Sequence, residues 1–174
     1  HLVITGGEPL LPGWQKAYVE LVRELKAIGA VLGTLHVTFE TNGTQKIDPE
    51  TFYYLSEHTQ LHFSVSTKLS ASGESFYDAV KPAVVKSYMG YGLVDFKFVV
   101  ADQAGFDEVD SLLSKDFAEL VNSPSFGSVY IMPVGGTNEV YELNQKDVAD
   151  LCIKHGYRFS PRLQCILFGN SWNT

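Results

Sequence analysis

The regular spacing of short apolar segments is the sequence feature that most constrains the fold. Segments that are predicted to form strands end at residues 5, 40, 66, 100 and 132. The ends are spaced about 30 residues apart, which is the length of one strand–helix unit in a parallel sheet. The spacing therefore predicts a single α/β domain over residues 1–174, with strands at 2–5, 35–40, 61–66, 94–100 and 128–132.

Helical patterns fill the gaps between these strands. Asp48 followed by Pro49 is typical of a helix start, because the carboxylate can cap the first turn and proline needs no N–H there. Pro82 argues against a helix that runs on from Glu74, since proline interrupts a helix interior. The predicted helices are 14–28, 49–57, 82–88, 106–121 and 145–155, the last capped by Asn144, with residues 69–80 as a loop and 157–169 as extended chain.

Composition and charge exclude some classes of function. The chain is 45% hydrophobic and 19% charged, and its net charge is −7 with scattered lysines and arginines. A large nucleic-acid interface is not expected, because it would need a basic stripe. No apolar run approaches the roughly 20 residues that span a bilayer, so no membrane partner is expected either.

The two cysteines and the start of the chain are interpreted separately. Cys152 and Cys165 lack metal-ligand spacing. We interpret them as small core residues, and a disulfide between them has no support. The chain begins at His1 inside a predicted strand. We therefore interpret it as an amino-terminally truncated piece of a longer protein.

Polar and glycine-rich clusters follow the predicted strands at their carboxyl ends. In parallel α/β sheets these ends share one edge, where ligands bind. The clusters therefore predict a binding site there. Each cluster also has an ordinary structural explanation: a turn at Gly6-Gly7 or Asn42-Gly43, or a solvated Lys68 beside an edge strand. The clusters are residues 5–9, 40–44, 64–68 and 132–136.

Several charged residues need an explanation of their own. Glu40 ends a strand that should be largely buried, so its carboxylate should need a partner. Asp95 and Lys97 stand two residues apart on one strand face, and we prefer an ion pair between them to a role in substrate binding. The histidines, at positions 1, 36, 58, 62 and 155, share no motif, and we assign them no catalytic role.

Taken in order, the clusters resemble those of the radical S-adenosylmethionine enzymes. In detail they resemble the 7-carboxy-7-deazaguanine synthase family of queuosine biosynthesis, a tRNA modification, and of other deazapurine pathways. Gly-Gly-Glu-Pro at residues 6–9 matches the segment that receives the methionine ammonium of the cofactor. The segment from Arg158 to Gln164 resembles the closing segment that folds back over the substrate. The resemblance implies a partial (β/α) barrel that lacks its first βα unit.

The resemblance also implies roles for individual residues. Thr67 stands where relatives often have proline, and Gln164 where many have histidine, so the role of Gln164 stays open. The implied substrate contacts are Thr5, Arg162, Gln164 and the carboxylate of Thr174. The implied contacts to S-adenosylmethionine are Gly6, Gly7, Glu8, Glu40, Asn42, Ser66, Thr67, Lys68, Met132, Pro133, Val134 and Gly135.

The family's Cys-x3-Cys-x2-Cys loop is missing from this sequence. In the family that loop holds a 4Fe-4S cluster through thiolates, and a threonine just after it helps to bind Mg²⁺. We therefore assign no catalytic residue and no metal ligand to the chain, and we expect the fragment alone to be inactive. The cluster and magnesium ligands are expected outside it.

For the intact protein the resemblance implies a radical ring contraction. The reduced cluster cleaves S-adenosylmethionine to methionine and a 5′-deoxyadenosyl radical, which takes a hydrogen from C6 of 6-carboxy-5,6,7,8-tetrahydropterin. Ammonia leaves and 7-carboxy-7-deazaguanine forms. The family is cytoplasmic and usually homodimeric, and an electron donor such as flavodoxin or ferredoxin is expected as a partner.

Three other functions deserve comparison. A radical-generating activase of the glycyl-radical type shares Gly-Gly-Glu-Pro and the partial barrel, but it does not need Ser66-x-Lys68 together with a Pro-Arg-Leu carboxyl terminus. A cluster-free binding protein differs from a truncated synthase only in upstream sequence. A plain nucleotide-binding domain is disfavoured, because the chain has no glycine-rich phosphate loop.

Overall fold

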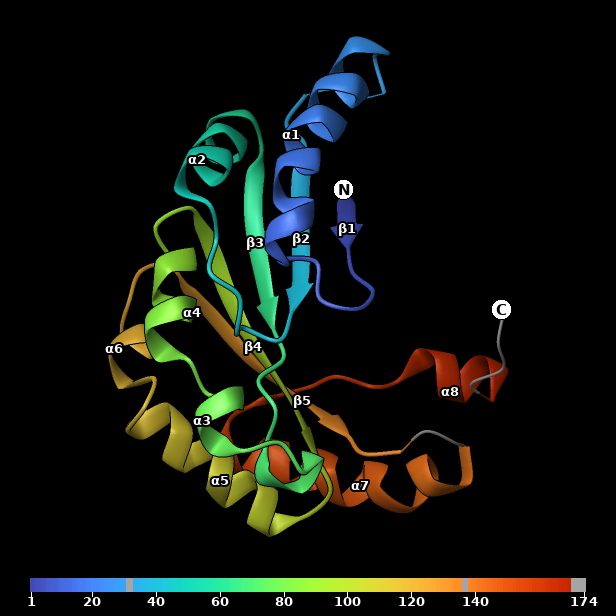
Figure 1. The fold of residues 1–174 in the computed structure, drawn as a ribbon. Coiled ribbons are helices and arrows are strands. Elements are labelled where there is room, and N and C mark those ends of the chain that lie inside the picture. Colours follow the sequence, from blue (N-terminus) through green and yellow to red (C-terminus); the bar gives the residue numbers. More distant parts are fainter. Residues whose placement is uncertain (31–32, 136–137, 170–174) are drawn as a thin grey trace.

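Parallel strands lie side by side in chain order, β1 to β6, in one sheet of the computed structural model (Figure 1). The structure describes residues 1–30, 33–135 and 138–169, with the backbone alone at 138–141 and 143. Each strand pairs only with its neighbours along the chain, and every pairing is parallel. The strands are β1 (Leu2–Ile4), β2 (His36–Thr41), β3 (Gln60–Val65), β4 (Gly92–Val100), β5 (Phe126–Pro133) and β6 (Arg158–Phe159).

Helices cover one side of this sheet. Crossovers between parallel strands are right-handed as a rule, so strands added in chain order along one sheet place their connecting helices on one face. Figure 1 shows α2, α4 and α6 on one side of the strands and α8 on the other. This confirms the predicted α/β partial barrel. The helices are α1 (Pro12–Ala27), α2 (Pro49–His58), η1 (Ser70–Ser72), α3 (Phe76–Ala79), α4 (Pro82–Tyr88), α5 (Gln103–Ser114), α6 (Ala118–Val121), α7 (Asn138–His155) and α8 (Leu163–Phe168).

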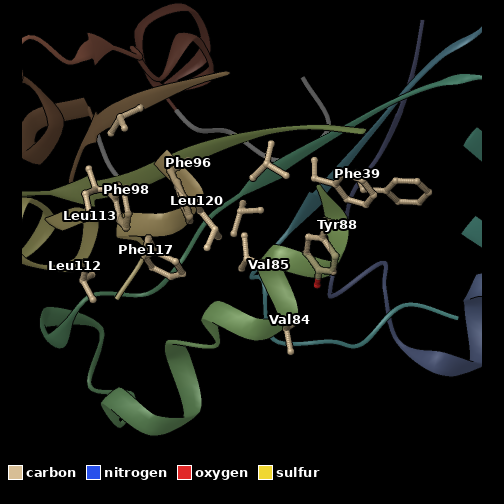
Figure 2. Packing of buried hydrophobic residues seen from close by; sticks show 14 of the residues in the cluster. Phe39, Val84, Val85, Tyr88, Phe96, Phe98, Leu112, Leu113, Phe117 and Leu120 are labelled. Carbon is tan, nitrogen blue, oxygen red and sulfur yellow. The ribbon is translucent and has the colours of Figure 1, made fainter. Parts of the chain in front are cut away.

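An aromatic core fills the space between the sheet and these helices. Phe63 of β3 stacks on Tyr88 of α4 with ring centroids 4.8 Å apart, and Phe96 of β4 lies 4.6 Å from Phe117. All four side chains are fully buried. Figure 2 shows several members of this core seated between the strands and helices α4 to α6. Apolar burial on this scale is the main stabilising contribution to such a domain.

The opposite face of the sheet is polar. Side chains alternate along a strand, so the residues between the apolar core residues point away from the helices. On β2 these are His36, Thr38 and Glu40, and on β4 they include Asp95 and Lys97. In a (β/α) barrel this is the inner face.

Gly43, just after β2, offers a test of the packing beneath the inner face. Its φ is +79°, and an added Cβ would lie 2.7 Å from Val65 Cγ1 and 3.2 Å from Val85 Cγ2. Gly43→Ala should lower the free energy of unfolding by about 2–4 kcal/mol in urea titrations, through backbone strain and overpacking.

Gly73→Ala is the matched control for Gly43→Ala. Gly73 has a φ of +80° but has nothing within 4 Å of its added Cβ. Gly73→Ala should lower the free energy of unfolding by about 1 kcal/mol, through backbone strain alone. Equal losses in the two variants would contradict the close packing around Gly43.

Several sequence predictions about local structure are confirmed. Asp48 caps α2, accepting from Thr51 N at 2.9 Å, and hydrogen bonding from the Thr51 side chain and then from its N–H lowers the pKa of the Asp48 carboxyl group. The predicted ends of the first and last helices near residues 28 and 155 are marked by Gly29 and Gly156, whose φ values are 68° and 75°. Cys152 and Cys165 are both buried free thiols. As a separate finding, no helix in the described part of the chain has the length and apolar character that crossing a membrane would need.

The carboxyl-terminal third departs from prediction. The helix predicted at 106–121 is two helices, α5 and α6. The chain turns between them, with Phe117 N bonded to Leu112 O at 2.9 Å, so that the Phe117 ring enters the core. α7 begins at Asn138, so the predicted cap, Asn144, lies within it. Its side-chain amide donates to Val134 O at 3.5 Å instead.

Two segments predicted without regular structure contain some. The loop at 69–80 includes η1 and α3, because Ser75 caps α3 by accepting from Asp78 N at 3.3 Å. The segment 157–169, predicted as extended, contains the short strand β6 and then α8, which ends at Gly169 with φ 59°.

The predicted apolar face of α1 is only partly buried. Val22 is buried, but Trp14, Leu21 and Ile28 are 60%, 38% and 72% exposed. β1 is the edge strand of the described sheet. α1 therefore packs against the sheet and α2 through a narrow row of residues, and the rest of its apolar face stays exposed.

Candidate functional site

Three adjoining cavities lie at the carboxyl ends of the strands. Ser66 and Lys68 line all of them, so they form one groove. The first cavity, of about 270 Å³, is lined by Thr5, Gly7, Glu40, Thr41, Asn42, Ser64, Ser66, Lys68 and Lys97. The second, of about 440 Å³, is lined by Ser66, Lys68, Lys97, Val99, Met132, Pro161, Arg162, Leu163, Gln164 and Cys165. The third, of about 230 Å³, is lined by Ser66, Thr67, Lys68, Leu69, Ala71, Ser72, Val99, Val134 and Arg162.

The turn after β1 is held in place by the carboxylate of Glu8. One oxygen accepts from Leu10 N at 2.9 Å and from Thr41 Oγ1 at 2.7 Å. The other accepts from Asn42 N at 2.8 Å. Gly7 precedes it with φ 56° and lines the first cavity. Glu8 thus joins the end of β1 to the end of β2. It lines none of the three cavities, so the structure places it as a support of the turn and not as the implied cofactor contact.

The loop after β2 is fixed both within itself and from the core. The Asn42 side-chain oxygen accepts from Thr44 N at 2.9 Å. Tyr88 donates its hydroxyl proton to Gln45 O at 2.6 Å. Burial raises the pKa of the Tyr88 hydroxyl well above its ordinary value, so this donor keeps its proton at all physiological pH values. The wall of the first cavity therefore rests on a rigid support.

Glu40 differs from its prediction. We expected a largely buried carboxylate, but Glu40 is exposed. Its position on β2 faces the open inner side of the sheet, whereas its neighbour Phe39 faces the helices. The expected partner exists: Glu40 Oε2 accepts from Thr5 Oγ1 at 3.0 Å. Two predicted ligand contacts thus meet in the wall of the first cavity.

The segment after β3 brings a cation into the groove. Ser64 and Ser66 lie on one face, as predicted, and both line the first cavity. Ser66 N donates to Thr41 O at 2.7 Å, which ties the segment to β2. Thr67 is buried, while Lys68 is exposed and reaches all three cavities.

The predicted ion pair between Asp95 and Lys97 is wrong. Asp95 accepts instead from His62 Nε2 at 2.8 Å and from Ser128 N at 2.5 Å. Both partners lie on the strands beside β4, and sequence spacing within one strand cannot show them. Lys97 does share the inner face with Asp95, as predicted, and it lines the first and second cavities.

Three of the histidines come together in space, although they share no motif in the sequence. His1, His36 and His62 line a cavity of about 250 Å³ near the amino ends of β2 and β3. Thr38 Oγ1 lies 2.8 Å from His1 Nε2 and 3.2 Å from His62 Nδ1. Even so, no group of three histidine, cysteine or acidic residues in the described ranges could hold a metal ion.

The remaining predicted residues fall into three groups. Met132 and Gln164 line the second cavity, Val134 the third and Arg162 both. Gly6, Pro133 and Gly135 line none of the three. Thr174 lies outside the described residues. Sequence reasoning missed Val99 and Leu163; Val99 follows Lys97 by two residues, and this alternation could have revealed it.

A 4Fe-4S cluster does not fit the described residues. Such clusters need several thiolate ligands, whereas Cys152 and Cys165 are buried on different helices, and burial raises the pKa of the Cys152 thiol. S-adenosylmethionine does fit the groove. The groove offers glycine backbone at Gly7, carboxylate and amide groups at Glu40 and Asn42, and a hydroxyl and an ammonium at Ser66 and Lys68, which complement a zwitterionic amino acid and a ribose.

A partial (β/α) barrel with such a groove at the carboxyl ends of its strands is the architecture that the resemblance to the radical S-adenosylmethionine class implies. Comparison with known proteins narrows this further. The chain is 32% identical over 181 residues to a 7-carboxy-7-deazaguanine synthase of Halobacterium salinarum, covering 100% of the chain and 67% of that protein. It is 30% identical to proteins of the same name from Pyrobaculum aerophilum, covering 98% of the chain and 66% of that protein, and from Rhodopirellula baltica, covering 100% and 63%.

The chain belongs to the 7-carboxy-7-deazaguanine synthase family. It spans about two thirds of the length of the curated relatives that it matches. No family model matches the chain, and no solved structure matches it with significance.

Proposed function

We propose that the intact protein converts 6-carboxy-5,6,7,8-tetrahydropterin to 7-carboxy-7-deazaguanine and ammonia. The observation that carries this proposal is the continuous groove shared by Ser66 and Lys68, which joins the polar ends of β1 to β3 with Arg162 and Gln164 before and within α8. The family relationship and the name shared by the relatives support the same reaction.

The residues divide the groove between two ligands. Glu40, Asn42, Ser66 and Lys68 hold S-adenosylmethionine, with Gly7 leaving room for its ammonium group. When bound, this cofactor supplies the radical chemistry. The chain orients the cofactor against the substrate and limits the access of water. Thr5, whose hydroxyl is held by Glu40 at 3.0 Å, stands where both ligands can be reached.

The segment around α8 supplies the other side of the substrate site. Arg162 is the N-cap residue of α8 and lines the second and third cavities together with Lys68. Its guanidinium has the planar donors that read a carboxylate or a pterin edge. A glycyl-radical activase does not need both Lys68 and Arg162 in the same groove. The synthase is therefore the favoured reaction.

The proposal extends to the parts that the described residues do not supply. The 4Fe-4S cluster and Mg²⁺ would be bound by further residues of the intact protein. We also propose that it works in the cytoplasm as a homodimer that receives electrons from a flavodoxin or ferredoxin.

An anaerobic assay of the full-length protein tests the proposed function. The reconstituted protein, with reductant, Mg²⁺ and S-adenosylmethionine, should release 7-carboxy-7-deazaguanine from the carboxytetrahydropterin, measured by mass spectrometry. Tetrahydropterin without the 6-carboxyl group should give no deazaguanine. Cleavage of the cofactor without any ring-contracted product would reject the proposal and favour the activase.

A further inference from the structure

Lys97 stands in the middle of the groove. Its neighbours on β4, Phe96 and Phe98, are fully buried on the helix side, so alternation turns Lys97 to the inner face. It is half-buried and lines both the first and the second cavity. It lies within β4, three residues before the end of the strand, whereas Lys68 comes after the end of β3. Lys97 is therefore the deeper of the two lysines.

No protein group within the described residues neutralises Lys97. Asp95, the nearest carboxylate on its own strand, is engaged by His62 and by the backbone of Ser128. The ion pairs of the described chain do not include Lys97. A ligand that fills the groove displaces water from this ammonium, and that costs free energy unless the ligand brings an acceptor.

The charge of the groove points to an anionic ligand group. Glu40 is the one carboxylate among the described residues that line the first and second cavities, against the two lysines Lys68 and Lys97. This cationic groove lies in a chain whose net charge is −7, so the local field opposes the overall charge and favours anions. The two ligands of the proposed reaction each carry a carboxylate, and two lysines at different depths can hold one each.

We infer that Lys97 determines substrate specificity by pairing with the 6-carboxylate of the pterin, while Lys68 holds the carboxylate of S-adenosylmethionine. This inference rests on the proposed function. It assigns Lys97 a role that the sequence alone did not favour, because the sequence suggested an internal ion pair. The ammonium would select carboxylated pterins over pterins that lack the group.

Binding of two air-stable probes to the full-length protein tests this role. The probes are 6-carboxypterin and pterin, with S-adenosylmethionine titrated separately. Lys97→Met should weaken binding of 6-carboxypterin by about tenfold or more and leave pterin and S-adenosylmethionine within about twofold, as expected for loss of one charge-assisted hydrogen bond. Lys97→Arg should recover part of the affinity. Lys115→Met, which removes an exposed lysine at the end of α5, is the matched control and should change nothing.

The outcomes separate this inference from the proposed function. If the wild-type protein prefers 6-carboxypterin and Lys97→Met keeps that preference, Lys97 does not read the carboxylate, although the proposed function stands. Equal weakening of pterin and 6-carboxypterin, or weakening of S-adenosylmethionine alone, also overturns the inference. If the wild type binds neither pterin, the inference and the proposed function fail together. Circular dichroism melting shows whether each variant is folded.

Discussion

Glu8→Ala should weaken the binding of S-adenosylmethionine to the full-length protein by about a hundredfold and lower its free energy of unfolding by about 2–4 kcal/mol. The carboxylate accepts from Leu10 N, Thr41 Oγ1 and Asn42 N at 2.7–2.9 Å. Alanine would leave these donors without their acceptor, and a part-buried donor that loses its partner costs more than the net value of one hydrogen bond. Calorimetric titration and urea denaturation measure the two effects.

The expected loss of affinity is indirect. Glu8 does not line the cavities. It holds the turn that presents Gly7 and the backbone of Asn42 to the first cavity. Without it, the ends of β1 and β2 are no longer joined at this point, and the edge strand β1 is free to shift. Binding energy then has to order the site before it can hold the ligand.

Two further variants sharpen the test of Glu8. Glu8→Gln keeps the shape and one carbonyl acceptor but sets an amide N–H against a donor, so its losses should fall between those of the wild type and alanine. Glu57→Ala removes an exposed carboxylate near the end of α2 and should leave both measurements unchanged. An unaltered dissociation constant in Glu8→Ala would show that the turn does not position the cofactor.

The fold was largely predictable, because its buried face follows from the alternation of apolar and polar residues over short stretches of sequence. Val94, Phe96, Phe98 and Val100 alternate with inner-face residues on β4, and similar apolar segments recur one βα unit apart. The sequence therefore predicted five of the strands in the right order. α8 escaped prediction, because Leu163, Ile166, Leu167 and Phe168 are 47–65% exposed and present no amphipathic pattern.

The site was predictable in its location and less so in its contacts. Parallel strands bring their carboxyl ends together, so Thr5, Glu40 and Ser66 were expected at one edge. Which side chains pair across the inner face depends on strand register, and a single sequence does not show it. Register places Ser64 opposite Asp95 and His62, two residues earlier on the same strand face, opposite Leu93. The His62–Asp95 contact took the place of the predicted ion pair.

Lys68→Ala should weaken S-adenosylmethionine binding by about tenfold to thirtyfold and leave 6-carboxypterin binding within about twofold. Lys68 reaches every cavity of the groove from just beyond the end of β3, and no ion pair within the described chain involves it. Because the side chain is exposed, the bond it would make to the cofactor carboxylate is partly screened, and the expected loss is smaller than that of Glu8→Ala.

Titration of both ligands against Lys68→Ala and Lys97→Met gives the decisive comparison. The two variants remove the same charge from the same groove, so any general loss of positive potential affects both alike. Opposite selectivity, with the cofactor lost in one and the carboxylated pterin in the other, would assign each lysine to its own carboxylate. Equal loss of both ligands in Lys68→Ala would contradict its assignment to the cofactor and leave it only a general electrostatic role.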